Sequence, residues 1–326
     1  MEPSLQASYA GLTLSSPIVI GSSGLTNNVD KIKEFEKVGA GAVVLKSLFE
    51  EQIWMDTQSM LEYNNSAEAT SYLQSYVQAN NLKQYTDLIS RSKSECRIPV
   101  IASINCYHAD SWVSFAREIE KAGADALEVN IFKLATNPHE ELGHYERLHV
   151  SILKRVKRET RLPIIIKMGQ RFSNIVSQVT QLKANEAAGV VLFNRLYTPD
   201  IDIDTMQITS GSVFSSSEEL GNTLRWVGVV SGQVPNFSIA ASTGVHGVTD
   251  PIKLILAGAS AVEVCSAVYQ QGPEVVTRMN DAMREWMKKK GYRSISSFRG
   301  ALNFQNIKDQ SLYERVQFMK YFSNHQ

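Results

Sequence analysis

The segment FSIAASTGVHGVTDPIKLILAGASAVEVCS, residues 237–266, indicates the fold class most directly. It holds two short apolar runs, at 238–241 and 260–264, and between them a helical pattern at 250–257 that ends at Gly258. Two buried strands joined by a helix form a parallel β-α-β unit, because parallel strands need a crossover connection. Small residues follow both strands, so the backbone N–H groups of these turns can approach an anion closely.

The same alternation of strand and helix runs through the rest of the chain. Six further apolar runs are predicted strands, at residues 18–21, 42–45, 99–104, 126–129, 163–166 and 189–193. Further helical patterns lie at residues 29–38, 78–93, 112–121, 144–159, 174–188, 217–232 and 274–290. Eight such units over about 250 residues predict an α/β protein that is a single (β/α)8 TIM barrel. An open doubly wound sheet is the alternative, but the sequence lacks the G-x-G-x-x-G turn of dinucleotide-binding folds.

The sequence gives no sign of a second domain. No linker-like stretch or change of composition divides it, so we predict one domain over residues 1–326. Within that domain, residues 48–75 are rich in Gln, Asn, Glu and Ser. Such a polar stretch is typical of an active-site loop or insert rather than of a core element.

Composition limits the class of function. The 326 residues include 33 basic and 33 acidic side chains, so no surface for nucleic acid is expected. The three cysteines, Cys96, Cys106 and Cys265, have no paired spacing, which argues against a disulfide framework and a metal site and favours a reducing compartment. The first residues do not resemble a signal peptide, and no apolar run reaches the roughly 18 residues of a membrane helix. We therefore expect a cytoplasmic protein without membrane contact.

Polar residues follow the predicted strands at the end where TIM barrels place their active sites. These residues are Ser23, Lys46, Ser47, Asn105, Asn130, Lys167, Asn194, Ser242, Gly244 and Ser266. A lysine beside an apolar core needs an anionic or electron-rich partner, because a buried, unpaired ammonium is costly. Asparagine offers a donor and an acceptor, which suits the edge of a heterocycle. Each residue also has a structural interpretation, as a loop lysine or a cap of a local turn.

Taken together, these strand ends predict a bound flavin mononucleotide (FMN). The loops after strands seven and eight of a TIM barrel commonly hold a phosphate. A lysine near the flavin N1 and C2 carbonyl would stabilise the negative charge that develops there on reduction. Cys106, His108 and His246 also follow strands and could reach a substrate, although such residues are more often structural.

Over most of its length the sequence resembles the dihydroorotate dehydrogenases, a family of FMN-dependent (β/α)8 barrels, and it is most similar to their soluble class. The similar segments occur in the family's order and end in a tail close to the family's C-terminal signature. They are GLTLSSPIVIGSSG (11–24), VVLKS (43–47), ALEVN (126–130), PIIIKM (163–168), VLFN (191–194), ASTGV (241–245), VEVCSAVYQQGP (262–273) and GYRSISSFRGAL (291–302).

The resemblance implies roles for particular residues. It implies that FMN is bound by Ser23, Gly24, Lys46, Ser47, Asn105, Asn130, Lys167, Asn194, Ser242, Thr243, Gly244, Cys265 and Ser266. Asn130 and Asn194 would also contact the substrate. The implied reaction is the oxidation of dihydroorotate or a related cyclic amide, with hydride transfer to flavin N5, as in pyrimidine biosynthesis.

The sequence departs from the family around the catalytic base. The family has Asn-x-Ser-Cys-Pro-Asn after this strand, or a serine in place of the base cysteine, whereas this chain reads NIFKLATN over residues 130–137. Lys133 falls at the base position, and it would need desolvation to act as a base near neutral pH. The family's substrate loop has only a weak echo in EYNNSAEATSYL, where Asn65 is a candidate substrate contact.

Three functions remain open at this point. The first is an FMN-dependent dehydrogenase, the second an FMN-binding homologue without dehydrogenase activity, and the third a phosphate-binding barrel that uses Lys167 as a Schiff-base lysine. The resemblance to the soluble class implies a homodimer or a pairing with an iron–sulfur flavoprotein subunit. Three cysteines cannot hold an iron–sulfur cluster alone, so any such cluster would lie on the partner.

Overall fold

Eight parallel strands form a closed barrel in the computed structural model, which describes residues 2–49, 67–105, 109–131 and 134–314. The barrel strands are β3 (Ile18–Ile20), β4 (Ala42–Val44), β6 (Val100–Asn105), β7 (Ala126–Ile131), β8 (Ile164–Met168), β9 (Gly189–Leu192), β12 (Ser238–Ser242) and β13 (Ala261–Val264). Strand β3 pairs with β4 on one side and with β13 on the other, which closes the sheet. The predicted (β/α)8 TIM barrel is confirmed.

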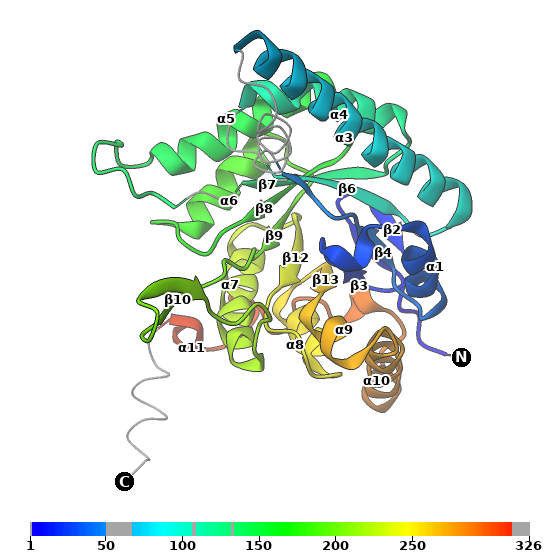
Figure 1. The fold of residues 1–326 in the computed structure, drawn as a ribbon. Coiled ribbons are helices and arrows are strands. Elements are labelled where there is room, and N and C mark those ends of the chain that lie inside the picture. Colours follow the sequence, from blue (N-terminus) through cyan, green and yellow to red (C-terminus); the bar gives the residue numbers. More distant parts are fainter. Residues whose placement is uncertain (1, 50–66, 106–108, 132–133, 315–326) are drawn as a thin grey trace.

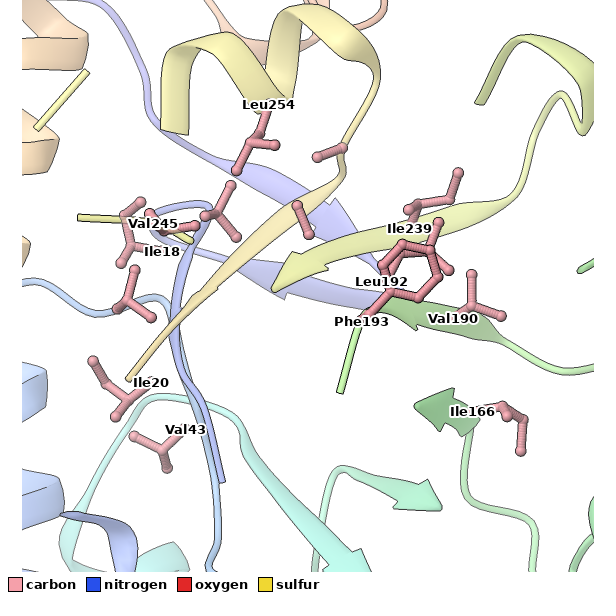
Figure 2. Close-up of a cluster of buried hydrophobic side chains, with 14 of the residues drawn as sticks. Ile18, Ile20, Val43, Ile166, Val190, Leu192, Phe193, Ile239, Val245 and Leu254 are labelled. Atoms are coloured by element: carbon pink, nitrogen blue, oxygen red, sulfur yellow. The ribbon is translucent and has the colours of Figure 1, made fainter. Parts of the chain in front are cut away.

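Helices surround this barrel, as Figure 1 shows. The α-helices are α1 (Val29–Lys37), α3 (Ala67–Glu95), α4 (Ala109–Lys121), α5 (His144–Glu159), α6 (Ile175–Ala184), α7 (Leu220–Gln233), α8 (Asp250–Ala257), α9 (Ser266–Gln271), α10 (Val275–Lys290) and α11 (Ser311–Glu314). Three short 3-10 helices are η1 (Gly24–Thr26), η2 (Ser217–Glu219) and η3 (Ile295–Ser297). The apolar faces of the α-helices pack on the outside of the strands, and this layer forms the larger part of the core. Figure 2 shows side chains of this outer layer, among them Ile20, Val43 and Leu254.

A second, smaller core fills the inside of the barrel. The hairpin of β1 (Ala7–Tyr9) and β2 (Leu12–Leu14) contributes the fully buried Tyr9 and Leu14 to it. These side chains pack with Ala126 and Ala261, which begin their strands. The hairpin therefore closes the amino-terminal end of the barrel and leaves the carboxyl ends of the strands as the place for a site.

Helix α3 differs from the prediction. It begins at Ala67, so residues 67–75 of the predicted insert at 48–75 are helical, and β5 (Leu48–Phe49) pairs with β6. Composition suggested a loop, whereas Ala, Glu, Leu and Gln in this stretch are good helix formers. Residues 50–66, which make up most of the predicted loop, lie outside the described residues.

A hairpin of β10 (Pro199–Asp202) and β11 (Gln207–Ser210) follows β9 and was not predicted from the sequence. All eight of its strand residues are exposed, and β10 stands out from the barrel at the lower left of Figure 1. Because neither strand alternates into a core, the sequence carries no period-two signal at this place.

Candidate active site

Three predicted site residues form a row across adjacent barrel strands. Asn105 at the end of β6 is in register with Asn130 on β7, and Asn130 is in register with Lys167 on β8. All three side chains are buried. The Asn194 amide nitrogen, just after β9, donates to the Asn130 amide oxygen at 3.1 Å and extends the row. One edge of the barrel mouth therefore presents amides and an ammonium side by side.

Lys46 lies at the same end of the barrel, after β4, and its side chain is exposed. The hydroxyl of its neighbour Ser47 is turned toward other residues, at 3.0 Å from the Ser22 hydroxyl and 2.7 Å from the Ser103 hydroxyl. The Tyr85 hydroxyl donates to the Ser103 carbonyl at 3.0 Å. Ser47 is thus held by a buried hydrogen-bonded chain, which fixes the start of the loop after Lys46.

The buried ammonium of Lys167 contacts two carboxyl groups. Its Nζ donates to Glu263 Oε2 at 2.7 Å and lies 3.4 Å from Glu128 Oε1. Burial disfavours the ammonium, but the charges of Glu128 and Glu263 outweigh that effect and raise the pKa of Lys167. Lys167 is therefore a permanent cation at neutral pH.

The two carboxyl groups beside Lys167 point into the barrel. Glu128 lies two residues from Ala126, and Glu263 two residues from Ala261, so each faces the inner core to which those alanines belong. Burial, together with the charge of Glu263, raises the pKa of Glu128 to about 8, although Lys167 opposes the shift. At neutral pH Glu128 therefore retains a proton and does not act as an ionised partner of Lys167.

The turn after β12 has the conformation of a backbone anion site. Thr243 and Gly244 both have positive φ, +84° and +85°. Gly244 and Val245 are buried, and no hydrogen bond from the described residues satisfies their backbone N–H groups. Buried N–H groups almost always have a partner, so these two indicate a ligand with acceptor oxygens. The half-buried Ser242 leads into this turn.

Ser266, after β13, takes part in a contact that ties the site to the segment following the β10–β11 hairpin. Its hydroxyl accepts a hydrogen bond from the Ser215 N–H at 3.0 Å. The Ser215 hydroxyl lies 3.0 Å from His246 Nε2. The loops after β11, β12 and β13 therefore meet at one place.

Cys265 follows β13, and Ser23 follows the neighbouring strand β3. Burial raises the pKa of the Cys265 thiol, while a hydrogen bond with Ser23 and the charge of Lys167 act in the opposite direction. The thiol is therefore protonated near neutral pH. The Ser23 hydroxyl also caps η1 by accepting from the Leu25 N–H at 3.2 Å, which places Gly24 as the first residue of that turn.

Comparisons with known proteins agree with this geometry. The family model described as dihydroorotate dehydrogenase matches residues 4–287. The chain belongs to the dihydroorotate dehydrogenase family. It is 27% identical over 308 residues to the "Dihydroorotate dehydrogenase B (NAD(+)), catalytic subunit" of Thermoplasma volcanium, which covers 91% of this chain and 97% of that protein. It is 23% identical over 324 residues to the "NAD-dependent dihydropyrimidine dehydrogenase subunit PreA" of Escherichia coli, with 92% of this chain and 77% of that protein covered.

Membership in the dihydroorotate dehydrogenase family makes the chain an oxidoreductase of that type. The residues predicted for the flavin side, from Ser23 to Ser266, are brought to one end of the barrel. The candidate base Lys133 and the candidate substrate contact Asn65 lie outside the described residues. Cys106 and His108 lie there as well.

Sequence reasoning missed the acidic partners of Lys167. Glu128 and Glu263 stand within the apolar segments ALEVN and AVEVCS. A charged residue two positions before a strand-end site residue lies on the same inward face, and that spacing was the available signal. Tyr9 was missed too, because nothing in a three-residue strand indicates that it reaches the barrel interior.

Two further classes of site have no support. Among the described residues, no group of three or more His, Cys, Asp or Glu side chains could hold a metal ion. In the same part of the chain, no helix has the length and apolar character required to cross a bilayer.

Proposed function

We propose that the chain binds FMN at the carboxyl end of the barrel and oxidises dihydroorotate or a related dihydropyrimidine. The row of Asn105, Asn130 and Lys167 on adjacent strands carries this proposal. An amide–amide–ammonium edge matches a ring with alternating carbonyl and N–H groups. The unsatisfied N–H groups of Gly244 and Val245 fit the phosphate of the same cofactor.

Each side chain has a role in binding. Lys167 and Lys46 would hold the flavin's electron-rich edge, and Ser242, Thr243, Gly244 and Ser266 would surround its phosphate, with Ser23, Gly24, Ser47 and Cys265 lining the cofactor. Asn130 and Asn194 would orient the substrate ring, because their mutual hydrogen bond fixes both amide planes. The flavin, when bound, accepts the hydride that leaves the substrate.

Lys133 is proposed as the group that takes the substrate proton, with Asn65 as a further substrate contact. A lysine can act as a base near neutral pH when desolvation lowers its pKa. The competing proposal is an FMN-binding homologue without dehydrogenase activity, favoured by the absence of a Cys or Ser base in NIFKLATN.

Absorbance spectroscopy of the purified protein tests both proposals. We expect flavin bands that bleach when dihydroorotate or dihydrouracil is added without oxygen. Lys133→Gln should keep the bands and lose the bleaching, whereas the exposed control Lys289→Gln should bleach normally. Bands that persist in the wild type with both substrates would favour the homologue without activity. A protein without flavin bands, even after FMN is added, would overturn the cofactor proposal.

A homodimer is proposed for the assembly, with the β10–β11 hairpin as its interface. The hairpin exposes Ile201, Ile203, Met206 and Ile208, each at least 65% accessible. A contiguous set of this kind on a projecting element is typical of a protein–protein contact. The comparison with proteins named "catalytic subunit" supports a second proposal, an iron–sulfur flavoprotein partner. The free Cys96 and Cys265 support a cytoplasmic location.

Light scattering measures the assembly directly. We expect a dimer for the wild type and a monomer for the variant carrying Ile203→Asp and Met206→Asp. Leu142→Asp is the matched control, because Leu142 is 98% exposed but lies before α5, away from the hairpin sequence. A hairpin variant that remains a dimer would place the interface elsewhere.

A further inference from the structure

The cluster of Glu128, Lys167 and Glu263 is unusual because it holds two carboxyl groups for one ammonium. The side chains of Glu128 and Glu263 are 1% exposed and that of Lys167 is 8% exposed. With both carboxyls ionised, the cluster would carry one net negative charge. A buried charge without compensation is costly, so a single proton on either carboxyl would stabilise the cluster by making it neutral.

The hydrogen bonds within the cluster agree with a bound proton. Neither oxygen of Glu128 has a hydrogen-bond donor among the described residues, nor does Glu263 Oε1. Glu128 Oε1 and Glu263 Oε2 nevertheless lie 3.4 Å and 2.7 Å from the same Lys167 Nζ, which brings the two side chains together. Two carboxylates both accept and cannot bond to each other, whereas a carboxyl and a carboxylate can. A proton between them gives one oxygen of each carboxyl group a hydrogen-bond partner.

Other titratable groups that face the pair do not supply this proton at neutral pH. Tyr9 from β1 has its pKa raised by burial and by the charges of Glu263 and Glu128. Tyr85 from α3 has its pKa raised by burial, although its hydrogen bond to Ser103 opposes the shift. Both phenols therefore stay neutral, and Lys167 stays charged. Among the described groups of the cluster, Glu128 is the one whose pKa lies near neutral pH.

We propose that Glu128 and Glu263 share one proton beneath Lys167, and that, above the pH at which this proton is lost, the pair binds it again from water when a flavin contacted by Lys167 is reduced. The second half rests on the proposed function, because it requires bound FMN. Hydride transfer adds one negative charge to the flavin, and the proton bound by the pair compensates it. The pair makes no bond to the substrate, so its members are positioning residues that act through Lys167.

The expected pH dependence follows from the charges. At a pH where the pair holds its proton, the cluster is neutral. At higher pH the cluster carries one negative charge, which opposes reduction of the flavin until a proton is bound. In Glu263→Gln or Glu128→Gln the remaining carboxylate and Lys167 are neutral together without any proton. In the single variants, reduction of the flavin should therefore no longer depend on proton uptake by the pair. Only the double variant leaves the charge of Lys167 uncompensated.

Infrared spectroscopy tests the shared proton without any need for activity. We expect the carbonyl band of a protonated carboxyl in the wild type at pH 7 that disappears above about pH 8, the pKa of Glu128. Each single variant should lack this band, and the exposed control Glu218→Gln should retain it. No such band in the wild type at pH 7, or a band that persists in both single variants, would overturn the proposal.

Spectroelectrochemistry of the FMN-loaded protein tests the coupling. The midpoint potential of the wild type should fall more steeply above the pH at which its carboxyl band disappears, and this bend needs no variant to be seen. The double variant should prefer reduced flavin by about tenfold at every pH, which is about 30 mV for a two-electron couple. Parallel profiles in the wild type and the single variants would overturn the coupling. If the protein binds no FMN, the proposed function fails, and the infrared titration still decides whether the proton is shared.

Discussion

Gly244 combines a left-handed backbone with a lack of space, and the two effects can be separated. Its φ is +85°, and a Cβ at this position would lie 2.2 Å from the Leu220 backbone nitrogen. Gly11 has nearly the same φ, +84°, but has nothing within 4 Å of an added Cβ. We expect Gly244→Ala to lower the free energy of unfolding by about 2–5 kcal/mol and Gly11→Ala by about 1–2 kcal/mol.

Urea denaturation of both variants measures this difference. The Gly11 variant reports the cost of the left-handed conformation alone, and the difference between the two variants reports the close approach to α7. Equal losses in the two variants would mean that α7 moves away from the turn at little cost. The orphan N–H groups of this turn would then not be held in place by packing.

At single positions, the sequence predicted which residues stand at the strand ends but not what they contact. Lys167 and Asn130 were placed correctly because an apolar run followed by a polar residue marks the end of a buried strand. Lys167 and Glu263 are 96 residues apart in the sequence, so no local pattern encodes their contact. The contact of Lys167 with Glu128 also joins two different strands. The hydrogen bonds of the Ser47 hydroxyl with Ser22 and Ser103 likewise join separate parts of the chain and have no local signal.

Among the elements, α10 fastens the strands on which the barrel closes. Its Asn280 accepts a hydrogen bond from the Ser16 hydroxyl at 2.6 Å and donates to the Gly39 carbonyl at 2.8 Å. Ser16 precedes β3 and Gly39 precedes β4, so one buried amide ties together the starts of two adjacent barrel strands. Replacing it removes the acceptor of the buried Ser16 hydroxyl and a donor to the half-buried Gly39 carbonyl.

We expect Asn280→Ala to lower the free energy of unfolding by about 1–3 kcal/mol, the cost of leaving the buried Ser16 hydroxyl without its acceptor. The neighbouring Asp281→Ala is the control. Asp281 forms an exposed ion pair with Arg284, and such pairs contribute about 0–1 kcal/mol. Chemical denaturation of the two variants measures both values, and a loss for Asn280→Ala no larger than that of the control would contradict this role of α10.

Elements with a buried face could be predicted, and those without one could not. Each of the eight helices predicted from the sequence overlaps a helix of the structure, and α5 begins and ends as its pattern indicates, at residues 144 and 159. The hairpin of β10 and β11 has only exposed residues, and β1 and β2 have three residues each, so neither gives a period that can be recognised. Helix α6 ends at Ala184, before the predicted residue 188, because Glu186 adopts a φ of +63° that a helix cannot continue through.

The whole barrel determines the electrostatics of its centre. Glu128 lies inside a closed ring of strands whose amino-terminal end is covered by the β1–β2 hairpin, and its side chain is 1% exposed. The chain has no net charge at pH 7, and a general charge repulsion therefore contributes little to stability near neutral pH. Above about pH 6.5, a pH-dependent stability should arise mainly from this buried carboxyl. Below that pH the buried His149, whose pKa is lowered to about 4 by burial, acts in the opposite direction.

We expect the free energy of unfolding to fall as the pH rises from about 6.5 to about 8. The pKa of Glu128 is raised from 4.5 to about 8 in the folded protein, so in this range the folded state holds a proton that the unfolded chain has released. The unfolded state then binds fewer protons at this carboxyl, so stability decreases with pH, by roughly 2 kcal/mol between pH 6.5 and pH 8. At lower pH the buried, neutral His149 offsets this decrease. Glu128→Gln removes the titrating pair and should flatten the profile, while the exposed Glu218→Gln should leave it unchanged. Denaturation of the three proteins at a series of pH values measures the slopes, and a wild-type stability that rises toward pH 8 would show that the barrel holds both carboxylates ionised.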